Sequence, residues 1–264
     1  MRAVTWNVNS LRSRIGHVTA WIDRHEPDVV LLQETKCSDE VFDESLRPRF
    51  VERGFETAHH GRDHRNGVLV ASRVGLHDVR YGFDGSAAEP FDETRLVIAT
   101  CGDVRFASVY VPNGRKAYTE HWHHKVAWLR RLRNEVAPAL LGRPAMIAGD
   151  VNVQRDDHDV YDPRQWRKRN HATPEERAEL AGLLGDGWRD VLREHQPGPG
   201  VYTWWNHAAG QFERNRGMRI DLALCSLPLA AAVTDAWVDV IERAEPKSSD
   251  HAPVVVDVDL GLLA

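Results

Sequence analysis

The chain has few cysteines, no long hydrophobic run and no excess of basic residues. Its three cysteines show neither a paired spacing nor the spacing of a metal site, which argues against a disulfide scaffold and predicts a reducing, intracellular setting. The longest apolar stretch, residues 222–233, is too short to span a membrane and is interrupted by Ser226 and Pro228. The sequence begins with an alternating strand pattern and not with an apolar signal segment. We therefore expect a cytoplasmic protein without a membrane partner.

The charge balance excludes a basic footprint over the whole surface. The chain has 34 basic and 39 acidic residues, which give a formal net charge of −5. A protein of this composition that binds nucleic acid must concentrate its positive charge locally. Each short basic run, taken alone, is more typical of a solvated surface. The candidate runs are 164–169, Arg115-Lys116 and the trio Arg214, Arg216 and Arg219.

Hydrophobic patterning predicts many strands and a few long helices. Apolar residues recur with helical spacing in residues 13–25, 119–136 and 174–185, and a capping box opens the last of these segments. This mixture indicates an α/β layered domain. Because no internal repeat or linker interrupts the chain, we expect a single domain over residues 1–264. The predicted strands are 3–8, 28–32, 67–72, 95–100, 104–110, 145–148, 219–224 and 253–260.

A carboxylate and a carboxamide follow the apolar run 146–148. Strand side chains alternate, so Asp150 and Asn152 point to the same side while Val151 packs behind them. The carboxylate can accept a proton from water, and the amide can hold that water against an electrophile. The pattern alone is also that of an ordinary turn. It gains weight because similar polar residues end other predicted strands.

Three further predicted strand ends carry polar side chains. Asn7 and Asn9 share one face of the first strand, and Glu34 follows a near-continuous apolar run. Asp250 and His251 precede the last strand, where a carboxylate beside an imidazole can hold it charged near neutral pH. Turn formation or helix capping is the alternative for each residue alone. Burying polar side chains at several strand ends together costs free energy, and a divalent cation at Glu34 would relieve that cost.

These motifs, in this order and spacing, resemble the exonuclease III family of the endonuclease/exonuclease/phosphatase superfamily. The resemblance extends from residue 2 to residue 257, nearly the whole chain. The run Asn215-Arg216-Gly217 fits the nuclease branch better than the lipid- or inositol-phosphate branches. The matching motifs are Trp6-Asn7-Val8-Asn9, Leu32-Gln33-Glu34-Thr35-Lys36, Tyr110-Val111-Pro112-Asn113, Gly149-Asp150-Val151-Asn152, Arg219-Ile220-Asp221 and Ser249-Asp250-His251-Ala252-Pro253.

The resemblance implies the four-layer α/β sandwich of deoxyribonuclease I-like enzymes, in which two packed mixed sheets are flanked by helices. It also implies a metal-dependent DNA phosphodiesterase of base-excision repair that cleaves 5′ to abasic sites and trims 3′ ends to leave a 3′-hydroxyl. Its partner would be double-stranded DNA with abasic sites or 3′ ends, and the enzyme would act as a monomer. The alternatives are an enzyme that is chiefly a 3′-5′ exonuclease, a phosphoesterase with a non-DNA substrate and a DNA-binding module without activity.

The resemblance assigns catalytic roles to five residues of this chain. Asp150 and Asn152 match the water site that their spacing had already suggested. Tyr110, Asn152 and His251 match contacts to the phosphate, and Asp221 matches the carboxylate that orients the histidine. Whether the base is Asp150 or a pair involving His251 stays open at this stage.

The resemblance likewise implies a metal site. Glu34 and Asn7 match its region, and Asp250 is a further candidate ligand. The expected cofactor is Mg²⁺ or Mn²⁺, because hard cations prefer carboxylate and amide oxygens. Whether one or two ions bind stays open.

An apolar pocket is implied beside the reacting phosphate. Trp204, Met218 and Ile220 match the wall of a small pocket that accepts a base-less sugar, although the tryptophan is also a candidate core residue. Extruding a nucleotide costs least when there is no base to unstack. Asn206-His207 and Met218 depart from relatives that carry an acidic residue with a tyrosine, and an aromatic residue, at these positions. The first departure bears on the balance between exonuclease and abasic endonuclease activity, and the second on how strictly the pocket discriminates.

Other polar residues are candidates for contacts with the DNA. Lys36 is expected to bind a neighbouring phosphate, and Asn113 and Arg115 to contact the DNA beside the lesion. The segment 59–61 resembles a family loop, so we expect a surface or DNA-facing role for it. The histidines of 121–124 lack a cysteine or carboxylate partner at ligand spacing and are not expected to bind zinc.

Overall fold

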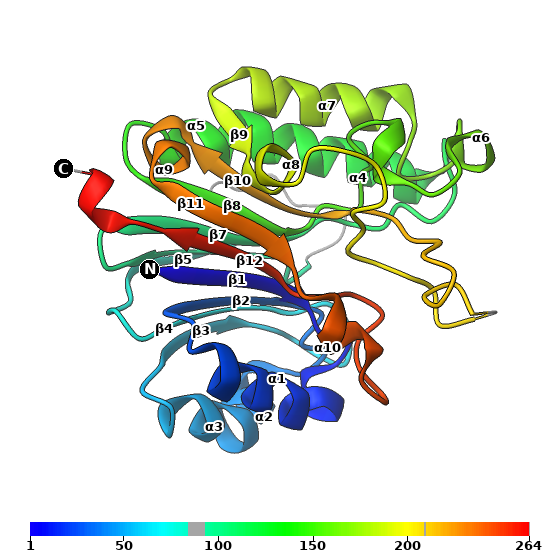
Figure 1. Ribbon diagram of the computed structural model, residues 1–264. Coiled ribbons are helices and arrows are strands. Elements are labelled where there is room, and N and C mark those ends of the chain that lie inside the picture. The colour runs from blue at the N-terminus through cyan, green and yellow to red at the C-terminus, as the bar shows by residue number, and fades with distance from the viewer. Residues whose placement is uncertain (84–92, 209, 264) are drawn as a thin grey trace.

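The computed structural model describes residues 1–83, 93–208 and 210–263. The strands of these residues form two six-stranded sheets that pack face to face (Figure 1). Across the first sheet the order is β11 (Val233–Val238), β12 (Val254–Val258), β1 (Arg2–Asn7), β2 (Val29–Gln33), β4 (Val68–Ser72) and β3 (Glu56–His60). Across the second it is β5 (His77–Tyr81), β6 (Leu96–Cys101), β7 (Val104–Tyr110), β8 (Ala145–Asp150), β10 (Asp221–Ser226) and β9 (Trp188–Asp190).

Each sheet contains both parallel and antiparallel pairs. In the first, β1 pairs in parallel with β2 and antiparallel with β12. In the second, β7 pairs in parallel with β8, which pairs antiparallel with β10. Both sheets are therefore mixed, as the resemblance implied.

Helices cover the outer face of each sheet (Figure 1). The first sheet is covered by α1 (Leu11–His25), α2 (Asp39–Val41) and α3 (Arg47–Val51), the last two joined by a π-helical turn, Phe42–Leu46. The second is covered by α4 (Glu120–Arg131), a π-helical turn (Leu132–Val136), α5 (Ala137–Leu140) and α7 (Pro174–Gly185). Shorter helices are α6 (Pro163–Trp166), α8 (Val191–His195), α9 (Leu227–Ala231), α10 (Val240–Ala244) and the 3₁₀ turns Asp157–Asp159 and Leu260–Leu263.

Three apolar clusters fill the spaces between the four layers. One lies between the sheets and includes Leu31, Val70, Phe106 and Val256. The others join each sheet to its own helices, as Trp21 does on the first sheet. The predicted four-layer α/β sandwich is therefore confirmed. Among the described helices, none combines the length and the apolarity that crossing a membrane requires.

The strand register brings the predicted site residues to one edge of the sandwich. Tyr110 of β7 and Asp221 of β10 both lie opposite Asp150 of β8. Because β12 runs antiparallel to β1, its start lies beside the end of β1, which carries Asn7. Residues far apart in sequence thus meet where these strands begin or end, at the right of Figure 1.

One residue of the candidate basic runs is part of the core. The Arg219 side chain is fully buried and binds the carboxylates of Asp159 and Asp190, with N–O distances of 2.6 and 2.9 Å. A buried guanidinium needs such partners, because an unpaired charge in the interior is costly. The expectation that Arg219 adds to a DNA-binding charge is therefore wrong, and the residue instead ties the start of β10 to the 157–159 turn and to β9.

Candidate active site

Asn7 connects the two carboxylates of the site. Its Nδ2 donates to Glu34 Oε1 and to Asp150 Oδ2, both at 2.9 Å. Its Oδ1 accepts the backbone N–H of Asn9 at 3.0 Å. Asn7 is fully buried at the end of β1, so the amide holds the two carboxyl groups, which come from different sheets, at a fixed separation.

His251 also approaches Asp150, at the same carboxylate oxygen that Asn7 contacts. Its Nδ1 is 2.8 Å from Asp221 Oδ2 and its Nε2 is 3.9 Å from Asp150 Oδ2. Burial disfavours the imidazolium, but Asp221, followed by Asp150 and Asp250, raises the pKa of His251 to about 10. The ring is therefore a cation at neutral pH, and Asp221 fixes its orientation.

The pKa of Asp150 is also raised, but for a carboxyl group this favours the neutral form. Burial, followed by the nearby Asp221 carboxylate, raises the pKa of Asp150 to about 7. Its Oδ1 accepts the backbone N–H of Asn152 at 3.0 Å. A Cβ atom at the preceding Gly149 would lie 1.9 Å from the carbonyl oxygen of Val109, so a larger residue there would push β8 away from β7. Asp150 is thus a rigidly placed group that can exchange a proton near neutral pH.

Glu34 differs from Asp150 in charge. Burial opposes ionisation, but the Lys36 ammonium, 2.7 Å from Glu34 Oε2, lowers the pKa of Glu34 below its usual value. Lys36 also donates to Asn9 Oδ1 at 2.6 Å. Glu34 is therefore an anion at neutral pH and stands ready to hold a cation. The predicted contact of Lys36 with a phosphate stays a prediction.

Asp250 is held by neutral donors. Its Oδ1 accepts from Asn9 Nδ2 and its Oδ2 accepts from Trp204 Nε1, both at 2.9 Å. Burial opposes ionisation, but His251 and these two hydrogen bonds lower the pKa of Asp250 to about 2. The carboxylate is ionised and adds to the field that keeps His251 charged. Its assignment as a metal ligand stays a prediction.

The donor set fits a hard divalent cation. Among the described residues, Glu34, Asp150 and His251 each offer a potential ligand atom within 4.8 Å of the other two. In the metal-free protein His251 is an imidazolium paired with Asp221 through Nδ1, and it would have to lose a proton before it could coordinate a metal. Glu34, which is already ionised, is therefore the first candidate ligand, and oxygen donors of this kind suit Mg²⁺ or Mn²⁺.

A buried ion pair supports the backbone at Asn152. The Lys125 ammonium, fully buried on α4, lies 2.5 Å from Glu176 Oε1 and donates to the carbonyl oxygen of Asn152 at 2.6 Å. His171 Nδ1 lies 2.5 Å from the same carbonyl oxygen. Glu176 also completes the capping box of α7 with Thr173, as predicted.

Sequence reasoning missed this support, although the sequence contained a signal. Lys125 lies three residues after Trp122 and four before Leu129, on the apolar stripe of its helix. A lysine at such a position must either reach solvent or find a buried partner.

The remaining polar candidates lie around this centre. Asn113 Nδ2 donates to Asn152 Oδ1 at 3.2 Å, and Asn152 Nδ2 donates to the carbonyl oxygen of Val111 at 3.0 Å. Burial, followed by the Glu34 carboxylate, raises the pKa of Tyr110 well above its usual value. The phenol therefore stays protonated and is a hydrogen-bond donor. The Arg95 guanidinium lies 4.5 Å from the centre of its ring.

The predicted apolar pocket residues form one cluster. Met218 and Ile220 are buried with Val160, and Trp204 and Trp166 pack against them. A β-bridge joins Trp204 to His251, so the cluster lies directly beside the candidate centre. In this arrangement the apolar side chains contact one another, and Met218 is only 2% exposed.

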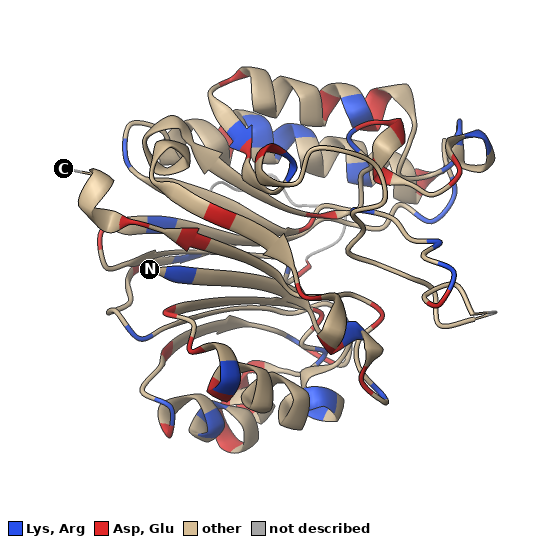
Figure 2. Cartoon of the chain, viewed as in Figure 1, with Lys and Arg blue, Asp and Glu red and all other residues tan. Residues whose placement is uncertain are grey.

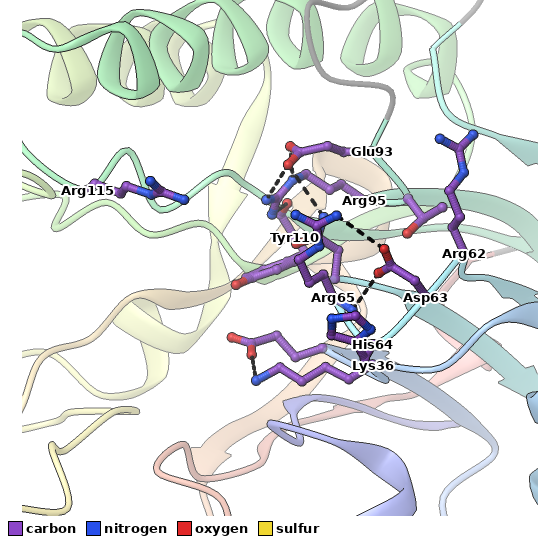
Figure 3. Close-up of a pocket in the computed structure, with 12 residues that line it drawn as sticks. Lys36, Arg62, Asp63, His64, Arg65, Glu93, Arg95, Tyr110 and Arg115 are labelled. Atoms are coloured by element: carbon purple, nitrogen blue, oxygen red, sulfur yellow. Dashed lines mark hydrogen bonds and ion pairs between the residues drawn. The ribbon is translucent and has the colours of Figure 1, made fainter.

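A cavity of about 550 Å³ lined by more basic than acidic residues opens next to Glu34 and Tyr110. Lys36 pairs with Glu34, and Figure 3 shows Lys36 with Arg65 and Asp63 paired above it and Arg95 bound to Glu93. Positive charge is thus concentrated at the site despite the net negative chain. Figure 2 shows further Lys and Arg on the loops beyond the same strand ends. The basic residues that line the cavity are Lys36, Arg62, His64, Arg65, Arg95 and Arg115.

A fold and a site of this kind define a hydrolase-like α/β sandwich with a candidate metal site. A profile described as the Endonuclease/Exonuclease/phosphatase family matches residues 4–251, and the chain belongs to that family. It is similar to exodeoxyribonuclease III of Haemophilus influenzae, with 29% identity over 267 residues that cover 96% of this chain and 98% of that protein.

Solved structures agree with this assignment. An AP endonuclease from Archaeoglobus fulgidus superposes with a TM-score of 0.91 and 33% identity, covering 98% of this chain and 99% of that one. A 3′ phosphatase from Neisseria, solved with a product DNA hairpin, superposes with a TM-score of 0.93 and 33% identity, again covering 98% and 99%. The predicted resemblance to the exonuclease III family is confirmed.

Proposed function

We propose that this protein is a metal-dependent DNA phosphodiesterase that cleaves 5′ to abasic sites and trims 3′ ends, leaving a 3′-hydroxyl. The observation that carries the proposal is the pair of carboxylates joined by Asn7, one ionised at Glu34 and one with a pKa near 7 at Asp150. Phosphodiester hydrolysis needs an activated water and neutralisation of the charge on the transition state. The names of the similar proteins, an exodeoxyribonuclease and an AP endonuclease, support DNA as the substrate.

The protein's own residues divide these tasks. Asp150 accepts the proton of the attacking water, and the Asn152 amide orients that water. The His251 imidazolium, held by Asp221, donates to a non-bridging phosphate oxygen, and the neutral Tyr110 phenol donates to another. Each donor is placed before substrate arrives, so little reorganisation is needed during the reaction.

A Mg²⁺ or Mn²⁺ ion held at Glu34 would supply Lewis acidity toward the phosphate. Asn7 keeps the Glu34 carboxylate in place, and Asp250 remains a candidate ligand. Lys36, which pairs with Glu34, would contact a neighbouring phosphate.

The substrate would be double-stranded DNA, bound by one copy of this chain acting as a single domain over residues 1–264. The basic cavity that includes Arg115 would take the sugar-phosphate backbone, and Asn113 would contact it next to Asn152. Trp204, Met218 and Ile220 would receive the base-less sugar. An abasic nucleotide is favoured because extrusion costs least when no base must be unstacked.

A second candidate function is chiefly 3′-end trimming with weak abasic cleavage. The packing of Met218 and Ile220 against Val160 and Trp166 favours it, because these side chains already fill one another's space. A terminal nucleotide need not be extruded from the middle of a strand.

One assay separates these functions. A labelled duplex with a single abasic-site analogue is incubated beside an intact blunt duplex, each with Mg²⁺ or with EDTA. A Mg²⁺-dependent nick 5′ to the lesion, faster than shortening of the intact strand, is the expected result. Equal shortening of both duplexes supports the second candidate, and no cleavage of either contradicts both.

A further inference from the structure

The segment that follows β2 has an unusual backbone. Glu34 and Lys36 adopt left-handed conformations, with φ angles of 54° and 51°, on either side of Thr35. Residues with a Cβ atom rarely adopt this conformation and keep it only where their surroundings enforce it. Whatever holds this segment therefore also determines where the Glu34 carboxylate lies.

Backbone hydrogen bonds supply part of that restraint. The carbonyl oxygens of Glu34 and Thr35 accept from Ser10 and Leu11 at 2.8 and 3.1 Å. The N–H of Thr35 donates to the carbonyl oxygen of Gly67 at 3.1 Å. These contacts fix the peptide groups and leave the buried Thr35 side chain to be accounted for.

The Thr35 side chain is held by a chain of side-chain hydrogen bonds that reaches the surface. Thr35 Oγ1 is 2.8 Å from His59 Nε2, and His59 Nδ1 is 2.7 Å from Asp39 Oδ1. A carboxylate can only accept, so His59 donates from Nδ1 to Asp39, and its Nε2 shares the second hydrogen bond with the Thr35 hydroxyl. Asp39 Oδ1 also accepts the backbone N–H of Gly61 at 2.8 Å.

Packing leaves this relay of Asp39, His59 and Thr35 little freedom. The His59 ring stacks on Phe42 with 4.3 Å between ring centres, and its side chain is 1% exposed, contrary to the surface role expected for this segment. A Cβ atom at Gly61 would lie 2.5 Å from the His59 ring, and one at Gly67 would lie 2.1 Å from Thr35 Oγ1. Two close approaches thus clamp the imidazole and the hydroxyl.

Two other roles for these residues fail on geometry. An Asp-His-hydroxyl chain resembles a nucleophilic triad, but Thr35 is fully buried and cannot meet a substrate. The metal-capable group found among the described residues contains neither Asp39 nor His59.

We propose that the relay of Asp39, His59 and Thr35 positions Glu34 for metal binding. This inference rests on the proposed function only in taking Glu34 as the metal-binding carboxylate.

The test measures metal binding directly, by calorimetric titration of the full-length protein with Mn²⁺ in the absence of DNA. His59→Phe keeps a ring against Phe42 and removes both nitrogens, whereas His59→Gln restores an acceptor near the position of Nε2. Asp43→Asn is the matched control, because Asp43 is half-exposed, lies in the neighbouring helical turn and pairs with Arg47. We expect His59→Phe to weaken Mn²⁺ binding about tenfold, as loss of an outer-shell partner does. His59→Gln should recover part of the loss, and Asp43→Asn should bind as the parent does.

A double-mutant cycle separates positioning from a general loss of structure. Thr35→Val keeps the side-chain shape and removes the hydroxyl, so it should weaken Mn²⁺ binding as His59→Phe does. The double variant should be no weaker than either single variant, because both break the same connection. Thermal unfolding of each variant sets a titration temperature at which all are folded. Parent-like Mn²⁺ binding by His59→Phe, or additive losses in the cycle, would overturn the inference. If the parent itself bound no Mn²⁺, the assignment of Glu34, and with it the proposed function, would fail first.

Discussion

The end of β2 and the end of β8 deliver a carboxylate to the same site, but the two ends are built differently. Glu34 stands on left-handed backbone, paired with Lys36, and its pKa is lowered. Asp150 is the last residue of β8, next to a segment supported by the buried Lys125–Glu176 pair, and burial raises its pKa to about 7. When neighbouring carboxylates are perturbed in opposite directions, one is suited to hold a cation and the other to exchange a proton.

The two carboxylates also differ in exposure and in hydrogen bonding, as their separate roles require. The Glu34 carboxylate is partly exposed, as a ligand that must admit an ion needs to be. The Asp150 and Asn152 side chains are buried and held by backbone and amide hydrogen bonds, which keep them aligned for attack on a phosphate. Variants that change these carboxylates or their supports test whether Glu34 holds the cation and Asp150 exchanges the proton.

The largest effect is expected from Asp150→Asn. The variant keeps the shape of the side chain but cannot accept the proton of the attacking water. Single-turnover cleavage should fall by roughly 10²–10⁴-fold, while binding of the abasic duplex stays measurable. Asp235→Asn, on the exposed face of β11, serves as the control. Retained turnover in Asp150→Asn would remove this residue from the role of base.

Lys125→Met should destabilise the β8 end strongly. It leaves the buried Glu176 carboxylate without its ammonium partner, which costs about 3–5 kcal/mol in comparable buried pairs. Urea unfolding measures the loss. The double variant Lys125→Met/Glu176→Gln removes both charges and should recover much of the stability. A loss below about 1 kcal/mol in the single variant would show that the pair is not the support inferred here.

Glu34→Ala should act on the metal and not on the fold. Loss of an outer-shell partner typically costs about 10–100-fold in metal affinity, so loss of the ligand itself should cost at least as much. The Mg²⁺ concentration that gives half-maximal cleavage should therefore rise about tenfold or more. An unchanged Mg²⁺ titration would take Glu34 out of the ligand set.

The pH dependence of stability should show that His171, which is buried next to the end of β8, is neutral in the folded protein. Burial, followed by the nearby Lys125 ammonium, lowers the pKa of His171 to about 3 from the ordinary value of 6.5. The unfolded chain therefore binds a proton that the folded protein rejects between these values. The stability contributed by the neutral ring is fully present above the unfolded pKa and is lost as pH falls toward 3.

This acid-side loss amounts to about 1.4 kcal/mol at about pH 5.5 relative to about pH 8. His171→Asn keeps a donor for the carbonyl oxygen of Asn152 and cannot titrate. Its free energy of unfolding should therefore fall less than that of the parent over this pH range. Parallel curves for the two proteins would mean that His171 is not held neutral in the folded state.

The sequence predicted the centre of each sheet but not the edges. All the predicted strands are present, whereas β3, β5, β9 and β11, which lie at the four sheet edges, were not predicted. Their exposure patterns explain this. Most residues of His77–Tyr81 and Val233–Val238 are exposed or half-exposed, so no apolar run or clean alternation marks them. Edge strands are defined by a neighbour along one side only, and that neighbour is distant in sequence.

The same limit applies to the site. Asp150, Asn152 and Glu34 could be identified because they follow strands with strong apolar patterns. The residues that hold them in place, such as Lys125 and His59, come from other elements and become visible only when the layers pack. Local patterns predict which groups can react, and the tertiary fold decides how they are supported.

The most direct test of the division between the two strand ends is Mn²⁺ binding to Glu34→Ala and Asp150→Asn, measured by calorimetry beside the parent protein. We predict that Glu34→Ala loses at least about tenfold in Mn²⁺ affinity, whereas Asp150→Asn binds Mn²⁺ within about threefold of the parent although it no longer cleaves DNA. The reverse pattern, with Mn²⁺ binding lost in Asp150→Asn and kept in Glu34→Ala, would contradict the account.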